Sequence, residues 1–319
     1  MYDIPTPLGA NRLLTNLVVR KFLDNPVFNV SNLIMVLLVV ETGEITQSKL
    51  PVVTLENIGS EIKELVRLGI KGVKLFAPYK EKDSKAKGAF DKNSLMIRAI
   101  KEIKNVAPEI CIITETCLCP YTLNGSCVIS ERGIIDDKYT QEALITQSLL
   151  QVEAGANILG PAQMLEGMVK TLRYFLDKEG YNDIPLMPHI IFSSSLYNSY
   201  RRTMKVEVLE DARGPYHLNP NHTRLANHYA QKFISEGADM LLLEPAIFIL
   251  DIISKVRDKI VCPIAAFSVS GEYELINDTP QQSNILILIE AFSSLRRAGA
   301  DFIVTYSAKQ LAIAMNRCS

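Results

Sequence analysis

The sequence predicts a (β/α)8 barrel preceded by an N-terminal arm, and three observations favour this fold. Short apolar runs alternate with amphipathic helical segments along most of the 319-residue chain. Three of the joints between a helix and the next strand repeat one residue pattern. The first apolar run is not followed by the glycine-rich phosphate turn of an open, doubly wound sheet.

The predicted strands and helices alternate in chain order. The run from Leu33 to Val40 is continuously apolar, which is typical of a strand covered on both faces. The expected strands span residues 33–40, 72–77, 111–114, 157–160, 184–192, 239–244, 263–269 and 301–306. The expected helices span residues 58–68, 94–106, 141–153, 169–178, 225–235, 250–259, 284–297 and 310–316. Eight such pairs in about 290 residues match the size of a (β/α)8 barrel.

The repeated joints lie at residues 154–157, 236–239 and 298–301, each with glycine in second place. Glycine there supplies the left-handed residue that ends a helix before the next strand. A doubly wound sheet remains the competing fold, but Glu41-Thr42-Gly43 lacks its phosphate turn. We therefore expect a barrel over residues 31–319 and an arm over residues 1–30.

Composition excludes several classes of function. A formal net charge of −1 gives no electrostatic basis for binding nucleic acid or an anionic membrane. The longest apolar run is too short to cross a bilayer, and the first residues do not resemble a signal peptide. Six cysteines in a chain of this length, three of them clustered, fit a reducing compartment and a metal better than disulfides. We expect a cytoplasmic protein.

The clustered cysteines, Cys117, Cys119 and Cys127, follow the third predicted strand. On an extended strand, residues two apart point to the same side, so the first two sulfurs would share a face. Pro120 and Gly125 would turn the chain and return Cys127 as a third ligand. Three thiolates without a fourth local ligand suit a zinc ion with one open position. The alternative is three buried thiols without a metal.

Several polar residues are expected at the C-terminal ends of the strands, where barrel enzymes place their active sites. Glu244 ends an apolar strand, so its carboxylate should have a partner or a raised pKa. An ion pair on the barrel rim is the alternative. We interpret His189, His222 and His228 as structural or surface residues.

The segments Cys117-Leu118-Cys119-Pro120-Tyr121-Thr122 and Asn124-Gly125-Ser126-Cys127 resemble the zinc loop of porphobilinogen synthase, also called 5-aminolevulinate dehydratase. The resemblance extends from about residue 30 to residue 310. It implies a (β/α)8 barrel, a zinc cofactor, and a homo-oligomer in which the arm wraps a neighbouring subunit, an octamer in this family. The family joins two 5-aminolevulinate molecules through two lysine Schiff bases.

The resemblance also identifies departures at the two family lysines. One position is Glu244, and the other is Phe192, or Leu196 in a shifted alignment. An iminium serves as an electron sink in carbon–carbon bond formation, and neither a carboxylate nor a phenyl ring can form one. We therefore expect no Schiff base and no ordinary porphobilinogen synthesis. The nearest substitute lysines, Lys170, Lys205 and Lys309, lie in polar or loop-like surroundings.

The resemblance assigns substrate-binding roles to other residues. Arg202 and Arg213 match two arginines that grip a carboxylate in a mobile lid, although a solvated loop is the alternative for Arg202. His217 stands where the family has glutamine. Ser270 and Tyr306 match residues that bind the carboxylate of the other substrate, although both could be ordinary polar residues at strand ends.

Two hypotheses for function follow. The first is a zinc enzyme with altered chemistry, acting on a small amino or keto acid that carries a carboxylate, with Glu244, aided by Glu115, as general acid or base. Such an enzyme would serve a specialised biosynthetic pathway. The second is a non-catalytic paralogue that binds such ligands or regulates a true synthase.

Overall fold

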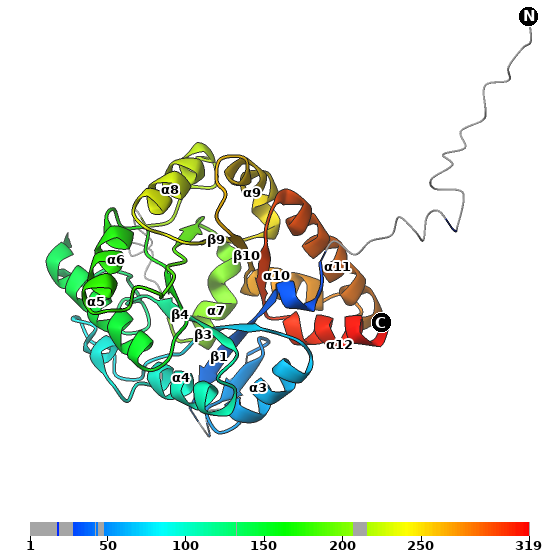
Figure 1. The fold of residues 1–319 in the computed structure, drawn as a ribbon, viewed down its shortest axis with the longest axis horizontal. Helices are drawn as coiled ribbons and strands as arrows, with labels where there is room; N and C mark the ends of the chain where they lie inside the picture. Colours follow the sequence, from blue (N-terminus) through cyan, green and yellow to red (C-terminus); the bar gives the residue numbers. More distant parts are fainter. Residues whose placement is uncertain are drawn as a thin grey trace, which may run out of the picture.

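The computed structural model describes residues 18, 28–41, 43, 48–131, 133–206 and 216–318. It is a parallel barrel surrounded by helices (Figure 1). The barrel strands are β1 (Leu33–Val40), β3 (Gly72–Phe76), β4 (Cys111–Thr116), β7 (Ile158–Pro161), β8 (His189–Ile191), β9 (Leu241–Glu244), β10 (Ile264–Ser268) and β11 (Phe302–Thr305). The predicted fold class is confirmed.

The strands pair in chain order, and the two ends of the sheet meet. Hydrogen bonds connect the strands in the order β7-β4-β3-β1-β11-β10-β9-β8. A parallel bridge between Leu159 and Leu186 joins β7 to the segment that enters β8. Two backbone bonds, from Leu159 N–H to the Pro185 carbonyl and from Met187 N–H to the Leu159 carbonyl, strengthen this closure. Because the sheet closes on itself, none of the barrel strands is an edge strand.

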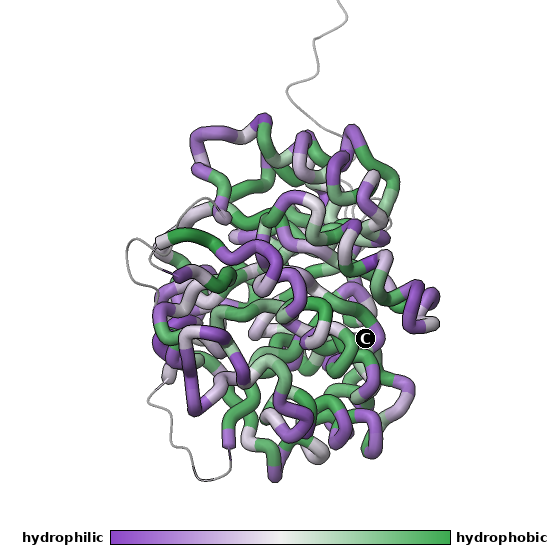
Figure 2. Tube along the Cα trace, turned by 90° about the vertical axis from the view of Figure 1, so that its left-hand side faces the viewer, coloured by the Kyte–Doolittle hydropathy of each residue, from purple (hydrophilic) through white to green (hydrophobic). Residues whose placement is uncertain are grey.

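Helices predicted from the apolar periodicity cover the outside of the barrel. They are α3 (Ile58–Arg67), α4 (Leu95–Val106), α5 (Asp137–Glu153), α6 (Met168–Lys178), α8 (Arg224–Ser235), α9 (Leu250–Arg257), α11 (Gln281–Ala298) and α12 (Ala308–Cys318). In α3, for example, Ile58, Ile62 and Leu65 recur at helical spacing and are fully buried. Figure 2 shows hydrophobic segments in the interior and hydrophilic ones at outer turns.

The three repeated joints adopt the expected conformation. Gly155, Gly237 and Gly299 have φ values of 113°, 103° and 111°. A side chain at Gly299 would also approach the Arg257 side chain to 2.6 Å. Glycine is therefore required there both by the left-handed backbone and by close packing.

Some elements were not predicted. They are β2 (Val52–Thr54), β5 (Ser130–Glu131), β6 (Ile134–Ile135), α7 (Asn198–Thr203), α10 (Ser270–Asn277), and the short 3-10 helices η1 (Val30–Asn32), η2 (Lys87–Phe90), η3 (Ser195–Tyr197) and η5 (Ile247–Ile249). Among them, η3, α7 and α10 follow barrel strands and line or cover the pocket described below.

The predicted arm, residues 1–30, lies mostly outside the described residues. Near its end, Phe28 is buried and packs edge-on against Phe292, with 6.4 Å between ring centroids. The arm and its boundary stay a prediction. No helix in the described part of the chain is long and apolar enough to cross a membrane.

Candidate active site

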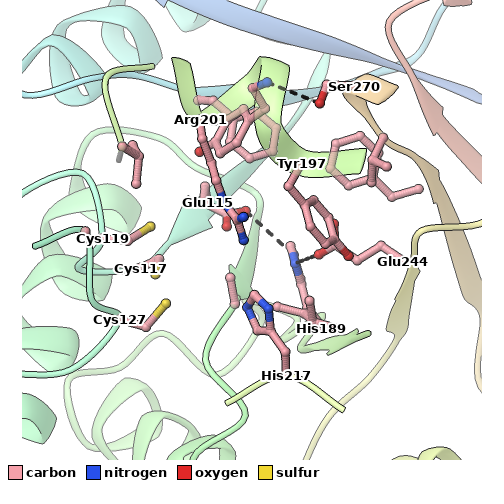
Figure 3. Close-up of a pocket in the computed structure, with 18 of the residues that line it drawn as sticks. Glu115, Cys117, Cys119, Cys127, His189, Tyr197, Arg201, His217, Glu244 and Ser270 are labelled. Atoms are coloured by element: carbon pink, nitrogen blue, oxygen red, sulfur yellow. Dashed lines mark hydrogen bonds and ion pairs between the residues drawn. The ribbon is translucent and has the colours of Figure 1, made fainter. Parts of the chain in front are cut away.

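A pocket opens at the C-terminal ends of the barrel strands and contains most of the predicted site residues. Its cavity volume is about 90 Å³, a size suited to a small organic acid. Its polar wall includes Glu115, Cys117, Cys119, Cys127, His189, Tyr197, Arg201, Tyr216, His217, Glu244, Ser270 and Tyr306. Figure 3 shows the three sulfurs on one side of this pocket and Glu244 with His189 on the other.

The three cysteine sulfurs lie close together, as predicted. They are within 4.8 Å of one another, and all three cysteines are free thiols. The reason given from the sequence was wrong, because β4 ends at Thr116 and the cysteines follow it in turns rather than on an extended strand. Tyr121 N–H donates to the Leu118 carbonyl at 2.9 Å to close the first turn.

Two glutamines of α5 hold the end of β4 in place. Gln147 donates to the Cys117 carbonyl at 3.1 Å, and Gln151 donates to the Glu115 carbonyl at 3.0 Å. The Gln151 side-chain oxygen also accepts hydrogen bonds from Thr114 and Thr116 at 2.8 and 2.7 Å. Because the glutamines are four residues apart, they lie on one helix face and fix the backbone from which the cysteines project.

The electrostatics of the sulfurs fit a metal site. Hydrogen bonds with Cys117 and Cys119 lower the pKa of Cys127 well below its usual value. Hydrogen bonds with Cys117 and Cys127, together with burial, raise the pKa of Cys119. For Cys117 the contact with Cys119 lowers the pKa, but the contact with Cys127 and burial raise it further, so the pKa is raised overall. One thiolate is thus stabilised by the others even without an ion. A cation would replace the shared protons, since thiolates are the metal-binding form. The cluster could therefore hold a metal ion.

Glu244 pairs with His189 across the other side of the pocket. Glu244 Oε1 lies 2.9 Å from His189 Nδ1, and both side chains are buried. Burial raises the pKa of Glu244 to about 8, and the nearby Glu115 carboxyl adds to this shift. Burial also lowers the pKa of His189, with a further contribution from the Lys74 charge. The predicted partner and raised pKa of Glu244 are both present.

This pair corrects two interpretations made from the sequence. His189 is not a surface residue, because it is buried and its ring lines the pocket and contacts Glu244. Glu244 is 5% exposed, so its carboxyl is not part of an ion pair on the rim. At neutral pH the Glu244 carboxyl therefore keeps its proton, and burial favours the neutral form of the His189 ring.

Sequence reasoning missed one buried charge, Lys74 on β3. Its Nζ lies 2.8 Å from Glu115 Oε2, and its side chain is fully buried. Desolvation raises the pKa of Glu115 to about 7, while Lys74 acts in the opposite direction. The available signal was a lysine in the otherwise apolar strand Gly72–Phe76, since a lysine buried there must be paired. Of the lysines considered instead, Lys309 pairs with Glu61 and Glu64.

The structure places Arg201, rather than Arg202, on the pocket wall. The Arg201 guanidinium lies 5.4 Å from the centre of the Tyr197 ring, a cation–π contact. Arg202 instead donates to Ser199 Oγ at 3.0 Å. Arg213 lies outside the described residues, so its predicted role is not tested.

Ser270 and Tyr306 were both predicted to bind a carboxylate. Their hydroxyl groups differ in whether another part of the protein already takes up their hydrogen bonds. Ser270 Oγ donates to the Leu196 carbonyl at 2.8 Å and accepts from Tyr200 N–H at 3.1 Å. It therefore ties α10 to the segment over the pocket. Tyr306 Oη is buried on the pocket wall and has no hydrogen bond within the described part of the protein. Such a group suits a ligand that supplies the missing partner.

Phe192 and Leu196, the residues expected at the second family position, both contribute backbone hydrogen bonds beside the pocket. Phe192 is 1% exposed and belongs to the hydrophobic core, while its backbone N–H donates to the Glu244 carbonyl at 3.0 Å. The Leu196 carbonyl accepts the hydrogen bond from Ser270. Phe192 thus supports the Glu244 strand end through its backbone.

The fold and the pocket define a (β/α)8-barrel protein with a cluster of three cysteines that could hold a metal, beside a buried carboxyl–imidazole pair. A family model described as delta-aminolevulinic acid dehydratase matches residues 9–314. The chain belongs to this family, and the resemblance noted in the sequence is confirmed.

Individual relatives agree with this assignment. Delta-aminolevulinic acid dehydratase of Bacillus subtilis (strain 168) is 34% identical over 310 residues, covering 94% of this chain and 96% of the relative. The enzyme of the same name from Helicobacter pylori (strain J99) is 34% identical over 269 residues, 83% of each chain. The crystal structure of porphobilinogen synthase from Toxoplasma gondii ME49, in complex with the product porphobilinogen, superposes with a TM-score of 0.92 at 29% identity, covering 98% of this chain and 93% of that one.

Proposed function

We propose that this chain is a zinc enzyme that acts on a 5-aminolevulinate-like amino or keto acid without forming a lysine Schiff base. The observation that carries the proposal is the buried Glu244–His189 pair, 2.9 Å apart, at the strand end where the resemblance expects an amine. The names of the relatives support the substrate class. The residues at positions 192, 196 and 244 support a different chemistry from theirs.

The pocket offers groups for binding a carboxylate substrate. Arg201 supplies positive charge, and the Tyr306 hydroxyl supplies a donor without a partner among the described residues. His217 lies on the same wall. Arg202 and Arg213 stay proposed contributors to carboxylate binding. A planar guanidinium suits a carboxylate because it donates two parallel hydrogen bonds.

Zinc fits the donor set of Cys117, Cys119 and Cys127, because soft thiolates favour it and three ligands leave one position open. When bound, zinc would supply a Lewis acid for a carbonyl, an amine or water.

Glu244 and His189 handle the proton in the proposed reaction. With its pKa raised to about 8, the Glu244 carboxyl can donate a proton near neutral pH and accept one again after ionising. His189 Nδ1 holds that carboxyl in place. Glu115 faces the other ring nitrogen, with 3.7 Å between its Oε2 and His189 Nε2. A substrate atom near Nε2 would complete the hydrogen bonding of the ring.

Two further expectations belong to this proposal. A cytoplasmic location suits free cysteines, which reducing conditions preserve. A homo-oligomer, an octamer by family resemblance, would bring the arm of one subunit against another.

The test is turnover of zinc-loaded protein with 5-aminolevulinate and related amino and keto acids, followed by mass spectrometry of the products. We expect Glu244→Gln to lower the rate by about 10²–10⁴-fold while ligand binding persists. The matched control is Glu166→Gln, because Glu166 forms an exposed ion pair with Lys232 away from the pocket.

Wild-type turnover by Glu244→Gln would contradict the assigned role of Glu244. Ligand binding by the wild-type protein without any turnover would favour the non-catalytic paralogue instead.

A further inference from the structure

Lys74 is a buried cation at the bottom of the pocket, beneath its polar wall. It stands in the middle of β3 and is 0% exposed. Its Nζ lies 2.8 Å from Glu115 Oε2 and 3.4 Å from the Thr114 carbonyl oxygen. A buried ammonium is costly unless such partners compensate for its lost hydration. Glu115 lines the pocket, whereas Lys74 lies behind it.

Strand β7, which pairs with β4, leaves space for this ammonium at Gly160. A Cβ atom on Gly160 would lie 2.9 Å from Lys74 Nζ, 2.8 Å from the Thr114 carbonyl oxygen and 3.1 Å from His189 Nε2. Any larger residue would therefore displace the lysine, the histidine or the strand. The ammonium of Lys74 and the imidazole of His189 thus meet in one space that glycine creates.

Four charged or titratable side chains then follow one another across the bottom of the pocket. Lys74 contacts Glu115 at 2.8 Å, and Glu115 Oε2 lies 3.7 Å from His189 Nε2. His189 Nδ1 contacts Glu244 at 2.9 Å. The four residues come from β3, β4, β8 and β9 in turn. His189 Nε2 has no hydrogen bond within the described residues, so only its approach to Glu115 orients that edge of the ring.

We propose that Lys74 is a positioning residue: its buried ammonium anchors the Glu115 carboxylate beneath His189 and thereby fixes the position and charge environment of the Glu244–His189 pair. The inference rests on the proposed function, in which that pair handles the substrate proton. Lys74 acts through Glu115 and His189 and does not contact the substrate.

The charges around Glu244 agree with this role. The positive charges of Lys74 and Arg201 lower the pKa of Glu244, whereas burial and the carboxyls of Glu115 and Glu272 raise it. The Lys74 charge also lowers the pKa of His189. Removing the Lys74 ammonium should therefore raise the pKa of both Glu244 and His189. A lysine far from this pair, such as Lys309 beside Glu61 and Glu64, would have no such effect.

The test uses ¹⁵N nuclear magnetic resonance of histidine-labelled protein, which reports the tautomer and protonation of each ring. The chain has four histidines, and a His189→Gln variant assigns the signal of interest. We expect Lys74→Met to raise the midpoint of the His189 transition by about one pH unit relative to wild type. The matched control is Lys309→Met, which removes a lysine paired with Glu61 and Glu64 and should leave the midpoint unchanged. Wild type and variants are compared at equal metal content.

Lys74→Met leaves the buried Glu115 carboxyl without its partner, which could prevent folding. A second comparison keeps the test valid in that case. Glu115→Gln is compared with the double variant Lys74→Met/Glu115→Gln, which has no unpaired buried carboxylate at this position. The double variant should again show the higher midpoint, by about one unit.

Two results would overturn the inference. One is an unchanged His189 midpoint when Lys74 is removed in a folded pair of variants. The other is a borohydride-reduced substrate adduct on Lys74, which would make Lys74 a nucleophile. The resonance measurement needs no substrate, so it separates a failure of this inference from a failure of the proposed function. Turnover with an unchanged midpoint rejects only the role of Lys74, whereas a shifted midpoint without turnover rejects only the proposed catalysis.

Discussion

Glu244→Gln should make the protein increasingly more stable than wild type as pH rises, although it should lower the rate of the proposed reaction by about 10²–10⁴-fold. The native Glu244 carboxyl is buried and has a pKa of about 8, against a value of 4.5 in the absence of these surroundings. A glutamine amide can donate to His189 Nδ1 as the neutral carboxyl does, and it carries no charge at any of these pH values. The substitution therefore keeps the contact and removes the titration.

The sign and size follow from proton linkage. Between pH 4.5 and 8, the folded chain keeps a proton on Glu244 that the unfolded chain releases. The free energy of unfolding therefore falls as pH rises through this window, by about 1.4 kcal/mol per unit at most. From pH 4.5 to pH 7 the loss is about 3 kcal/mol for this one carboxyl. Glu244→Gln should not lose this stability. The difference in unfolding free energy between the variant and wild type should reach its full size above the pKa of Glu244 in the folded chain.

Urea unfolding at pH 5, 6, 7 and 8, at equal metal content, measures the effect. The stability difference between Glu244→Gln and wild type should be below about 1 kcal/mol at pH 5 and about 3 kcal/mol at pH 7. The control Glu166→Gln should show no such rise, because Glu166 is exposed and its ion pair with Lys232 lowers its pKa. A variant less stable than wild type by the same amount at every pH would refute the reasoning, since Glu244 would then be ionised and paired in the native state.

Three further predictions concern the metal, the lysines and the pocket arginine. Purified protein should carry about one zinc per chain. Replacing Cys117, Cys119 and Cys127 by serine should remove the zinc, whereas Cys262→Ser should leave it in place. Full zinc content in the triple variant would show that the metal binds elsewhere. Borohydride with 5-aminolevulinate should leave the intact mass unchanged, and a stoichiometric adduct on any lysine, including Lys74, would contradict the proposed chemistry. Arg201→Met should weaken ligand binding by about ten- to a hundredfold, and Arg202→Met should weaken it less; the reverse order by titration calorimetry would return the role to Arg202.

The barrel could be predicted because its determinants are local and repeat along the chain. The apolar run at Leu33–Val40 became a strand buried along its whole length, and the glycine at each repeated joint adopts a left-handed conformation. Helices whose apolar face packs on the barrel were expected within a few residues of their observed ends. The helices α7 and α10 were missed, because their sequences are short and mixed and their positions depend on contacts with each other, such as the hydrogen bond from Tyr200 N–H to Ser270 Oγ.

The cysteine cluster could be predicted because its three members lie within one short segment. The pairing of Glu244 with His189 joins residues 55 positions apart, so no local pattern could reveal it. Lys74 and Glu115 are similarly distant in sequence and meet only when β3 and β4 lie side by side. The choice between Arg201 and Arg202 depended on the rotation of α7, a helix that the sequence did not predict.

The most direct test of the central claim is the identity of the product made from 5-aminolevulinate by the zinc-loaded wild-type protein. Mass spectrometry should show consumption of substrate that depends on both Glu244 and the metal, without accumulation of porphobilinogen. Porphobilinogen formed as the main product, at a rate unaffected by Glu244→Gln, would contradict the account and assign this chain the ordinary reaction of its family.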